Sequence, residues 1–282
     1  MFSNQAGKGN PLAVILDADG LATTAMQQIA AWTNLAETTF LLPPDAEGAD
    51  YLVRIFTTRQ EIAFAGHPSI GSAHAAITAG LCTPRDGKLL QQSLAGLLPI
   101  TQSDDAATLS VRVPPSRIVR YATGADAELQ RALGDVARGA LSPALVEGGR
   151  RWWLAELADE SVVRGMHPDH AAIAALAAAT GSLGLCVFAR VPSRTGGPDS
   201  LVVRAFPLGV GITEDPASGA ANAAIAAFLD QAGALEKLGD AFEVSQGREI
   251  GRDARLSLAI DRMREVWVGG PCRTVISGNL RW

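Results

Sequence analysis

His67 and Asp215 each stand directly before a proline, at the start of a stretch of small residues. Gly66-His67-Pro68 follows a short alternating apolar run and precedes small residues at helical spacing. Imidazole titrates near neutral pH and can pass a proton in either direction, which suits acid/base chemistry. Proline is well tolerated at the first position of a helix, so the pattern predicts His67 as the helix cap. Histidine is a poor cap, and a role other than capping is therefore open.

The surroundings of these two residues are repeated along the chain. Arg54-Ile55-Phe56 leads to Gly66-His67-Pro68 in the first copy, and Arg204-Ala205-Phe206 leads to Glu214-Asp215-Pro216 in the second. When the prolines are superimposed, the glycines three residues later coincide and His67 falls on Asp215. The repeat predicts two related halves, each with a strand, a turn and a buried helix that starts with proline. Two such helix N-termini, facing one another across a cleft, would suit a carboxylate.

The sequence pattern gives weaker evidence of a catalytic role for the other polar residues. Aspartate is among the best N-caps, so Asp215 is open between capping and an acid/base or orienting role. Glu37 enters a strand beside two threonines, which by itself favours a solvated face. His74 lies one heptad after His67, and we expect it to have a buried structural role.

Short apolar runs separated by turn residues predict many strands and few long helices, which favours α+β over a doubly wound parallel sheet. One helix is expected at 24–33, and strands are expected at 13–16, 37–42, 109–113, 151–157, 183–189, 201–206, 256–260 and 265–268. Val113-Pro114-Pro115 is the expected crossing between the halves.

Composition excludes several classes of function. The 24 Lys and Arg residues nearly balance the 29 Asp and Glu residues, at a net charge of −5, so nucleic acid is not expected as a partner. The three cysteines form no ligand spacing and are expected to be reduced core residues of a cytoplasmic protein. Residues 171–189 carry no charge, but Thr180-Gly181-Ser182 interrupts them, which predicts a helix, a turn and a strand rather than a membrane span. No nucleotide, flavin or metal motif occurs, and neither cofactor nor metal is expected.

Several separated motifs together resemble one known family, the phenazine-biosynthesis PhzF family, over essentially the whole chain. These motifs are Gly9-Asn10-Pro11-Leu12-Ala13-Val14, Met26-Gln27-x-Ile29-Ala30, Asn34-Leu35-Ala36-Glu37-Thr38, Gly66-His67-Pro68-Ser69-x-Gly71, Glu214-Asp215-Pro216-Ala217-Ser218-Gly219, Gln246-Gly247 and Gly251-Arg252.

The resemblance implies two similar lobes of the diaminopimelate epimerase type, each a β-sheet curled around a central helix, with the active site in the cleft between them. We expect residues 1–115, completed by 270–282, to form one lobe and residues 116–269 to form the other. The resemblance also implies a homodimer. The cysteine pair of the true epimerases has no counterpart, because neither turn contains cysteine.

By the same resemblance, Glu37 is the main proton-transfer residue, and His67 and Asp215 line the site. The implied reaction is a cofactor-free isomerisation, in which a small carboxylate loses a proton at one carbon and regains it elsewhere along a conjugated system. The residues implied to contact the substrate are Gly66, Ser69, Gly71, Ser72, Ser218, Gly219 and Ala220. Of these, the helix ends at Gly71 to Ser72 and at Gly219 to Ala220 are expected to hold the substrate carboxylate.

The sequence departs from the family pattern at three positions. Ala220 and Ala36 stand where serine is commoner, and Asn222 stands where histidine is frequent. Without the hydroxyl donor, the same substrate binds more weakly by about 1 kcal/mol, or a different substrate fits.

Two other functions are open from the sequence. One is a binding protein on the same scaffold, which sequesters a small carboxylate without chemistry. The other is a structural homodimer, which Trp152-Trp153 would suit as a contact surface.

Overall fold

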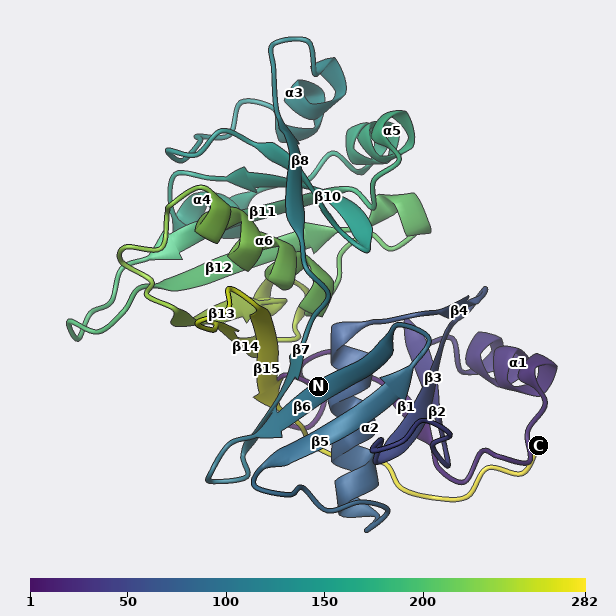
Figure 1. Cartoon of the computed structure of the whole chain (residues 1–282). Helices are drawn as coiled ribbons and strands as arrows, with labels where there is room; N and C mark the ends of the chain where they lie inside the picture. Colours follow the sequence, from purple (N-terminus) through teal and green to yellow (C-terminus); the bar gives the residue numbers. More distant parts are fainter. The chain divides into compact units, whose positions relative to one another are not determined.

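The chain forms two units in the computed structural model, which describes all 282 residues (Figure 1). The first unit contains Met1–Val113 and Val268–Trp282, and the second contains Pro114–Trp267. The chain thus leaves the first unit within Val113-Pro114-Pro115, where consecutive prolines disfavour a continuing helix or ladder.

The first unit is built on a mixed sheet in the order β1-β2-β3-β5-β6-β7-β15, with the short β4 paired to β3. β1 runs parallel to β2, and β3 runs parallel to β5, whereas β2 with β3, β5 with β6, and β6 with β7 are antiparallel. The strands are β1 Ala13–Ile15, β2 Glu37–Leu42, β3 Tyr51–Thr57, β4 Glu61–Ile62, β5 Lys88–Ser93, β6 Gly96–Gln102, β7 Thr108–Arg112 and β15 Val266–Pro271, of which the residues from Val268 on belong to this unit.

Two helices complete the first unit. α1 (Thr23–Thr33) buries Met26, Ile29 and Ala30 against the aromatic side chains of β2 and β3. α2 (Gly66–Thr78) contacts β1, β2, β3 and β7, and Figure 1 shows it running against the strands of this unit. Most of its residues are Gly, Ala or Ser, and the first eight are buried, because small side chains let the sheet close around the helix.

The second unit has a sheet in the order β14-β13-β12-β11-β10-β9-β8. The strands are β8 Arg117–Tyr121, β9 Ala144–Gly148, β10 Arg150–Glu156, β11 Leu185–Val191, β12 Ser200–Phe206, β13 Ala241–Gln246 and β14 Ala254–Ile260. The helices are α3 Ala127–Leu133, α4 Glu160–Gly165, α5 His170–Thr180, α6 Gly219–Gln231 and the single-turn η1 Leu208–Val210 and η2 Arg248–Ile250.

Helices cover both faces of this second sheet, because successive residues of a strand point to opposite faces. Trp153, Val187 and Val202 join one core with residues of α3, α4 and α5. The neighbouring Phe188 instead contacts Phe228 of α6, edge to face, at 6.3 Å between ring centroids. Successive strand side chains point to opposite faces, so α6 covers the face opposite α5.

The two units repeat one topology. β1, β2, β3, β5 and β6 are paired parallel, antiparallel, parallel and antiparallel, and β10 to β14 follow the same series. α2 connects β3 to β5, and α6 connects β12 to β13. The α+β fold class with two related lobes is therefore confirmed.

The predicted helix start is wrong in the first unit. α2 begins at Gly66, with Ala65 as an N-cap in the extended conformation at φ −152°, so His67 and Pro68 are the second and third helical residues. The first four N–H groups of a helix have no intrahelical acceptor, so a proline at the third position costs no hydrogen bond. Gly71 and Ser72 consequently lie in the second turn and not at the helix end.

The predicted helix start is also wrong in the second unit. Asp215 is not the cap, because its Oδ1 accepts from the Ala217 N–H at 3.2 Å and keeps the chain in a turn. Ser218 caps α6 instead, and its hydroxyl accepts from the Ala221 N–H at 3.3 Å. Pro216 therefore precedes α6 altogether.

Other expectations about buried residues change with the structure. Trp152 and Trp153 are 2% and 0% exposed, so this pair belongs to the core of the second unit and offers no contact surface. Cys186 is buried as expected, but Cys82 and Cys272 are only partly buried, and all three are free thiols.

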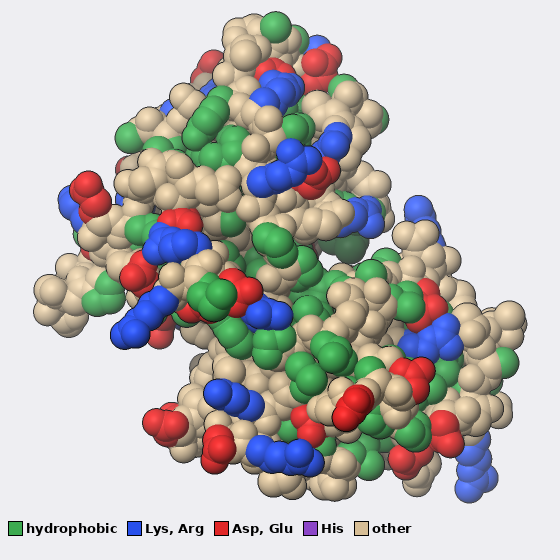
Figure 2. Space-filling model, viewed as in Figure 1, with side chains coloured by type: hydrophobic (Ala, Val, Ile, Leu, Met, Phe, Trp, Pro, Cys, Tyr) green, Lys and Arg blue, Asp and Glu red, His purple; other side chains and the backbone are tan.

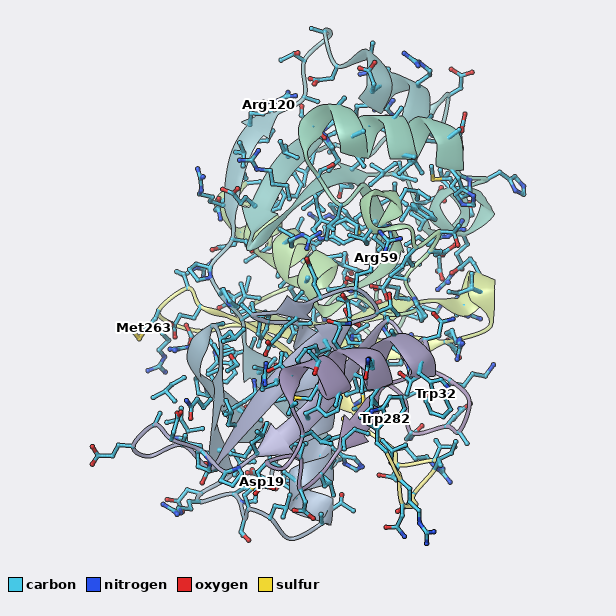
Figure 3. All side chains as sticks on the ribbon, turned by 90° about the vertical axis from the view of Figure 1, so that its right-hand side faces the viewer. Asp19, Trp32, Arg59, Arg120, Met263 and Trp282 are labelled. Carbon is cyan, nitrogen blue, oxygen red and sulfur yellow. The ribbon has the colours of Figure 1, made fainter.

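The surface is mixed in charge. Lys, Arg, Asp and Glu side chains alternate over the face shown in Figure 2. At the end of the chain, Trp282 lies beside Trp32 of α1 with 6.1 Å between ring centroids, and Figure 3 shows the two residues close together. None of the helices combines the length and the apolar composition needed to cross a bilayer.

The repeated Arg-x-Phe motif forms the same side-chain cluster in both units. The Arg54 guanidinium donates to both carboxylate oxygens of Glu61, at 2.8 and 2.6 Å, and lies 5.2 Å from the centre of the Phe56 ring. Arg204 makes the same paired contact with Glu214, at 2.9 and 2.8 Å, and lies 5.1 Å from the Phe206 ring. Each cluster ties the strand before the site helix to the segment that leads into that helix.

The two ion pairs differ in burial. The side chains of Arg204 and Glu214 are 7% and 8% exposed, whereas those of Arg54 and Glu61 are 23% and 20% exposed. Arg204 also donates to the carbonyl oxygens of Val163 and Met166, which leaves few of its N–H groups for water.

Changing Arg204 to Met should lower the free energy of unfolding by about 3–5 kcal/mol, because the Glu214 carboxylate is left buried without its partner. The matched change Arg54→Met should cost about 1 kcal/mol, since water reaches Glu61. Urea unfolding of both variants measures the difference. Equal losses would contradict the assignment of Arg204 as the buried anchor.

Candidate active site

Glu37 is brought to the edge of the first unit by the connection from α1 to β2. α1 ends at Thr33, and Asn34 adopts the left-handed conformation, with φ 54° and ψ 29°, which asparagine tolerates better than most residues. The chain then enters β2 with Glu37 as its first residue, opposite Thr57 of β3. Thr38 and Thr39 are fully buried, while the Glu37 side chain stays 18% exposed.

His67 lies against Glu37. The imidazole is the second residue of α2 and is 5% exposed. Its Nε2 lies 3.4 Å from Oε2 of Glu37, and its Nδ1 lies 3.5 Å from Nδ2 of Asn10. The structure therefore brings together two of the three residues that the sequence analysis expects to be catalytic, and it adds Asn10.

The contact with Asn10 favours one tautomer of His67. The amide nitrogen of asparagine can only donate, so Nδ1 of the imidazole accepts. In a neutral imidazole the proton is then on Nε2, which faces the Glu37 carboxylate. Burial lowers the pKa of His67 to about 3, because an imidazolium is poorly solvated there. At neutral pH His67 is thus uncharged, with its Nε2 beside the Glu37 carboxylate, and is not the counter-ion of Glu37.

The two serines expected to contact substrate in this unit make internal hydrogen bonds. The Ser69 hydroxyl donates to the carbonyl oxygen of Ala65 at 3.0 Å and accepts from Nε2 of Gln91 at 3.1 Å. The Ser72 hydroxyl donates to Oγ1 of Thr39 at 2.9 Å. Both serines are fully buried, and these bonds fix α2 to the sheet.

The two glycines have different surroundings. A Cβ at Gly71 would lie 2.5 Å from Cδ2 of Leu12, so this glycine allows close packing of α2. Gly66 is the first residue of α2 and is buried, and its N–H belongs to the turn that lacks intrahelical acceptors.

In the second unit, Asp215 lies in the turn before α6. Its N–H donates to the carbonyl oxygen of Ala205 at 2.9 Å, as an isolated bridge to β12. The buried Ser218 caps the helix, and Gly219 and Ala220 are its first two residues. Their N–H groups carry the partial positive charge of a helix N-terminus, which favours an anion.

A hollow of about 310 Å³ lies elsewhere in the first unit. It is lined by residues of α2, the β6–β7 turn and the C-terminal segment, among them His74 and Cys272, and by none of the predicted site residues. His74 is half-buried, and its Nε2 lies 3.0 Å from Oγ1 of Thr274, which agrees with a structural role. No group of three or more His, Cys, Asp or Glu side chains is arranged to hold a metal ion.

Sequence comparison identifies relatives over nearly the full chain. Residues 1–278 match the family described as phenazine biosynthesis-like protein, PhzC-PhzF. Antisense-enhancing sequence 1 of Schizosaccharomyces pombe is 35% identical, covering 99% of this chain and 96% of its own length. The trans-2,3-dihydro-3-hydroxyanthranilate isomerase of Pseudomonas chlororaphis is 32% identical, covering 95% of this chain and 92% of its own.

Solved structures agree on the fold. The PhzF-family protein of Bacillus anthracis has a TM-score of 0.80 at 23% identity, covering 96% of this chain and 93% of its own. A probable proline racemase from Agrobacterium radiobacter K84 has a TM-score of 0.57 at 16% identity, covering 90% and 82% of the two chains. Given the match over the whole chain and relatives that are isomerases, the chain belongs to the phenazine biosynthesis-like (PhzC-PhzF) family and is an isomerase.

Proposed function

We propose that the protein catalyses a cofactor-independent isomerisation in which Glu37 moves a proton on a small carboxylate substrate. The observation that carries this proposal is the partly exposed Glu37 carboxylate, 3.4 Å from the buried and neutral His67. A carboxylate that is open to solvent on one side and lies against an uncharged imidazole on the other suits a general base.

The substrate loses one proton and gains one in this reaction, and the proton held by the partly exposed Glu37 exchanges with water before it is returned. Glu37 takes the proton from a carbon next to a conjugated system, and the electron pair of the broken C–H bond shifts along that system. The protonated Glu37 then returns the proton to another carbon, so no oxidant, reductant or leaving group is required. The buried His67 ring, 3.4 Å from the carboxylate, restricts the orientations of Glu37 through both steps, which limits the entropy lost at the transition state.

Asp215 is assigned to the same reaction by the internal repeat, which aligns it with His67. The N–H groups of Gly219 and Ala220, at the start of α6, are proposed to bind the substrate carboxylate. Ala220 brings no side-chain hydroxyl to that carboxylate, so the substrate is either held by backbone groups or differs from the one used by relatives with serine.

The substrate of the Pseudomonas relatives is the first compound to test, since those enzymes are named isomerases of trans-2,3-dihydro-3-hydroxyanthranilate. We further propose a cytoplasmic homodimer. The free thiols Cys82, Cys186 and Cys272 agree with a reducing compartment.

The change Glu37→Gln should lower kcat by about 10²- to 10⁴-fold with little change in KM, because Gln keeps the shape but cannot accept the proton. The turnover rate is measured as the incorporation of deuterium from D₂O, detected by mass spectrometry. The compounds are small cyclic and amino carboxylates, including trans-2,3-dihydro-3-hydroxyanthranilate. Glu243→Gln, at an exposed strand glutamate, is the matched control and should keep native turnover.

Full turnover by a folded Glu37→Gln protein would contradict the proposal. Bound ligand recovered unchanged, with no deuterium incorporated by the native protein, would instead favour the carboxylate-binding alternative.

Acidification should destabilise the native protein through His67. The folded pKa of about 3 lies below the unfolded value of about 6.5, so the unfolded chain takes up the proton first as pH falls. The stability that the neutral His67 contributes is therefore fully present above pH 6.5 and is lost as the pH falls toward 3. The free energy of unfolding decreases by about 2 kcal/mol between pH 7 and pH 5. Urea unfolding at the two pH values should show this extra loss in the native protein but not in His67→Gln.

The exposed His167, changed to Gln in the same way, provides the control and should keep the native pH dependence. An identical pH dependence in native protein and His67→Gln would mean that His67 is not held neutral by burial.

A further inference from the structure

Gln246 holds both ends of the turn that carries Asp215. It is the last residue of β13 and is 1% exposed. Its Nε2 donates to the carbonyl oxygen of Asp215 at 2.9 Å, and its Oε1 accepts from the N–H of Ser218 at 3.2 Å. Because a backbone N–H can only donate and a carbonyl can only accept, these two contacts fix the orientation of the amide.

A second buried side chain shares this amide. Nδ2 of Asn222 donates to Oε1 of Gln246 at 2.7 Å and to the carbonyl oxygen of Ser218 at 2.8 Å. Asn222 is fully buried and is the fourth residue of α6. Gln246 therefore joins the turn, the helix cap and the helix to a single strand.

Two further contacts of the turn act at other places. The N–H of Asp215 bonds to Ala205 of β12, and the Asp215 carboxylate accepts from the nearby N–H of Ala217. The first contact fixes one end of the turn, and the second is local. The bond between Gln246 and Ser218 fixes the other end, where α6 begins.

A glutamine on the equivalent strand of the first unit, two register positions from the place of Gln246, reaches its helix differently. Gln91 of β5, the strand that follows α2, donates to the hydroxyl of Ser69 and accepts from the hydroxyl of Tyr51 at 3.1 Å each. It reaches its helix through a side chain, whereas Gln246 binds the backbone on both sides of Pro216. The second unit thus has a more direct support for its acidic residue.

We propose that Gln246 is a positioning residue that sets the place of Asp215 relative to the N-terminus of α6. This inference rests on the proposed function for the role of Asp215 in the reaction. Gln246 does not touch the substrate. It acts by keeping the carboxylate and the anion-binding N–H groups of Gly219 and Ala220 in a fixed mutual geometry, on which the rate of proton transfer depends steeply.

The test compares Gln246→Met with Gln231→Met in the full-length protein. Gln231 ends α6 and also binds backbone at both ends of its amide, donating to Ser116 and accepting from Ile118, but it lies at the opposite end of the helix. Gln246→Met should lower kcat by about tenfold or more, with KM within about threefold of the native value. Gln231→Met should keep both constants, and circular dichroism checks that both variants are folded.

Amide hydrogen exchange gives a readout that does not need turnover. Gln246→Met should speed exchange at the N–H groups of Ser218 and Ala217 by about tenfold or more, and Gln231→Met should speed it at Ile118 instead. If the native protein proves inactive on every compound, the proposed function fails, and unchanged exchange at Ser218 would also overturn the positioning role.

In an active protein, equal kcat values for Gln246→Met and Gln231→Met would overturn the inference. If Gln246→Met does not fold, Gln246→Glu carries the same test. That variant keeps the side-chain volume and the oxygen that accepts from Ser218, and it replaces only the donor to the Asp215 carbonyl, so the same loss of kcat is expected.

Discussion

Burial of the His67 imidazole is the constraint on which the candidate site depends. A buried imidazole is neutral at physiological pH and then has one donor and one acceptor nitrogen. Asn10 takes the acceptor, so the donor is directed at Glu37. The hydrogen bonds of Ser69 and Ser72, together with the close packing at Gly71, hold α2 where this contact is made. The elements around the site can therefore be understood as the means of holding one neutral N–H against one carboxylate.

The repeat conserves architecture rather than chemistry. In both units an arginine on the strand before the site helix pairs with a glutamate and packs on a phenylalanine, and a glutamine on the following strand supports the helix start. The residues at the aligned positions differ, because His67 lies inside α2 whereas Asp215 lies in a turn ahead of α6. One fold thus presents an imidazole from a helix in one unit and a carboxylate from a turn in the other.

The sequence predicts most of this fold because strand alternation and proline positions are local signals. β2, β12 and the helix-turn-strand series from α5 to β11 lie close to their expected bounds. The start of α2 could not be predicted, since Ala65 has no capping side chain. The start of α6 has a local signal in Ser218, but Asp215 is an equally good cap by residue type and competes with it in the sequence. The two Arg-Glu ion pairs could not be predicted from the sequence either, because the spacing between Arg54 and Glu61 differs from that between Arg204 and Glu214. The strands β5, β6, β8, β9 and β13 were not predicted; in β6, Pro99 counts against a strand when only the sequence is read.

The measurement that tests the central claim most directly is the ¹⁵N NMR spectrum of the His67 imidazole as a function of pH. The structure predicts a neutral ring at pH 7, with the proton on Nε2 and none on Nδ1, and the same state at pH 5. The loss of its signals in His67→Gln provides the assignment. An imidazolium at pH 7, or a neutral ring protonated on Nδ1, would contradict the account, because Nε2 would then either carry a charge toward Glu37 or have no proton to offer it.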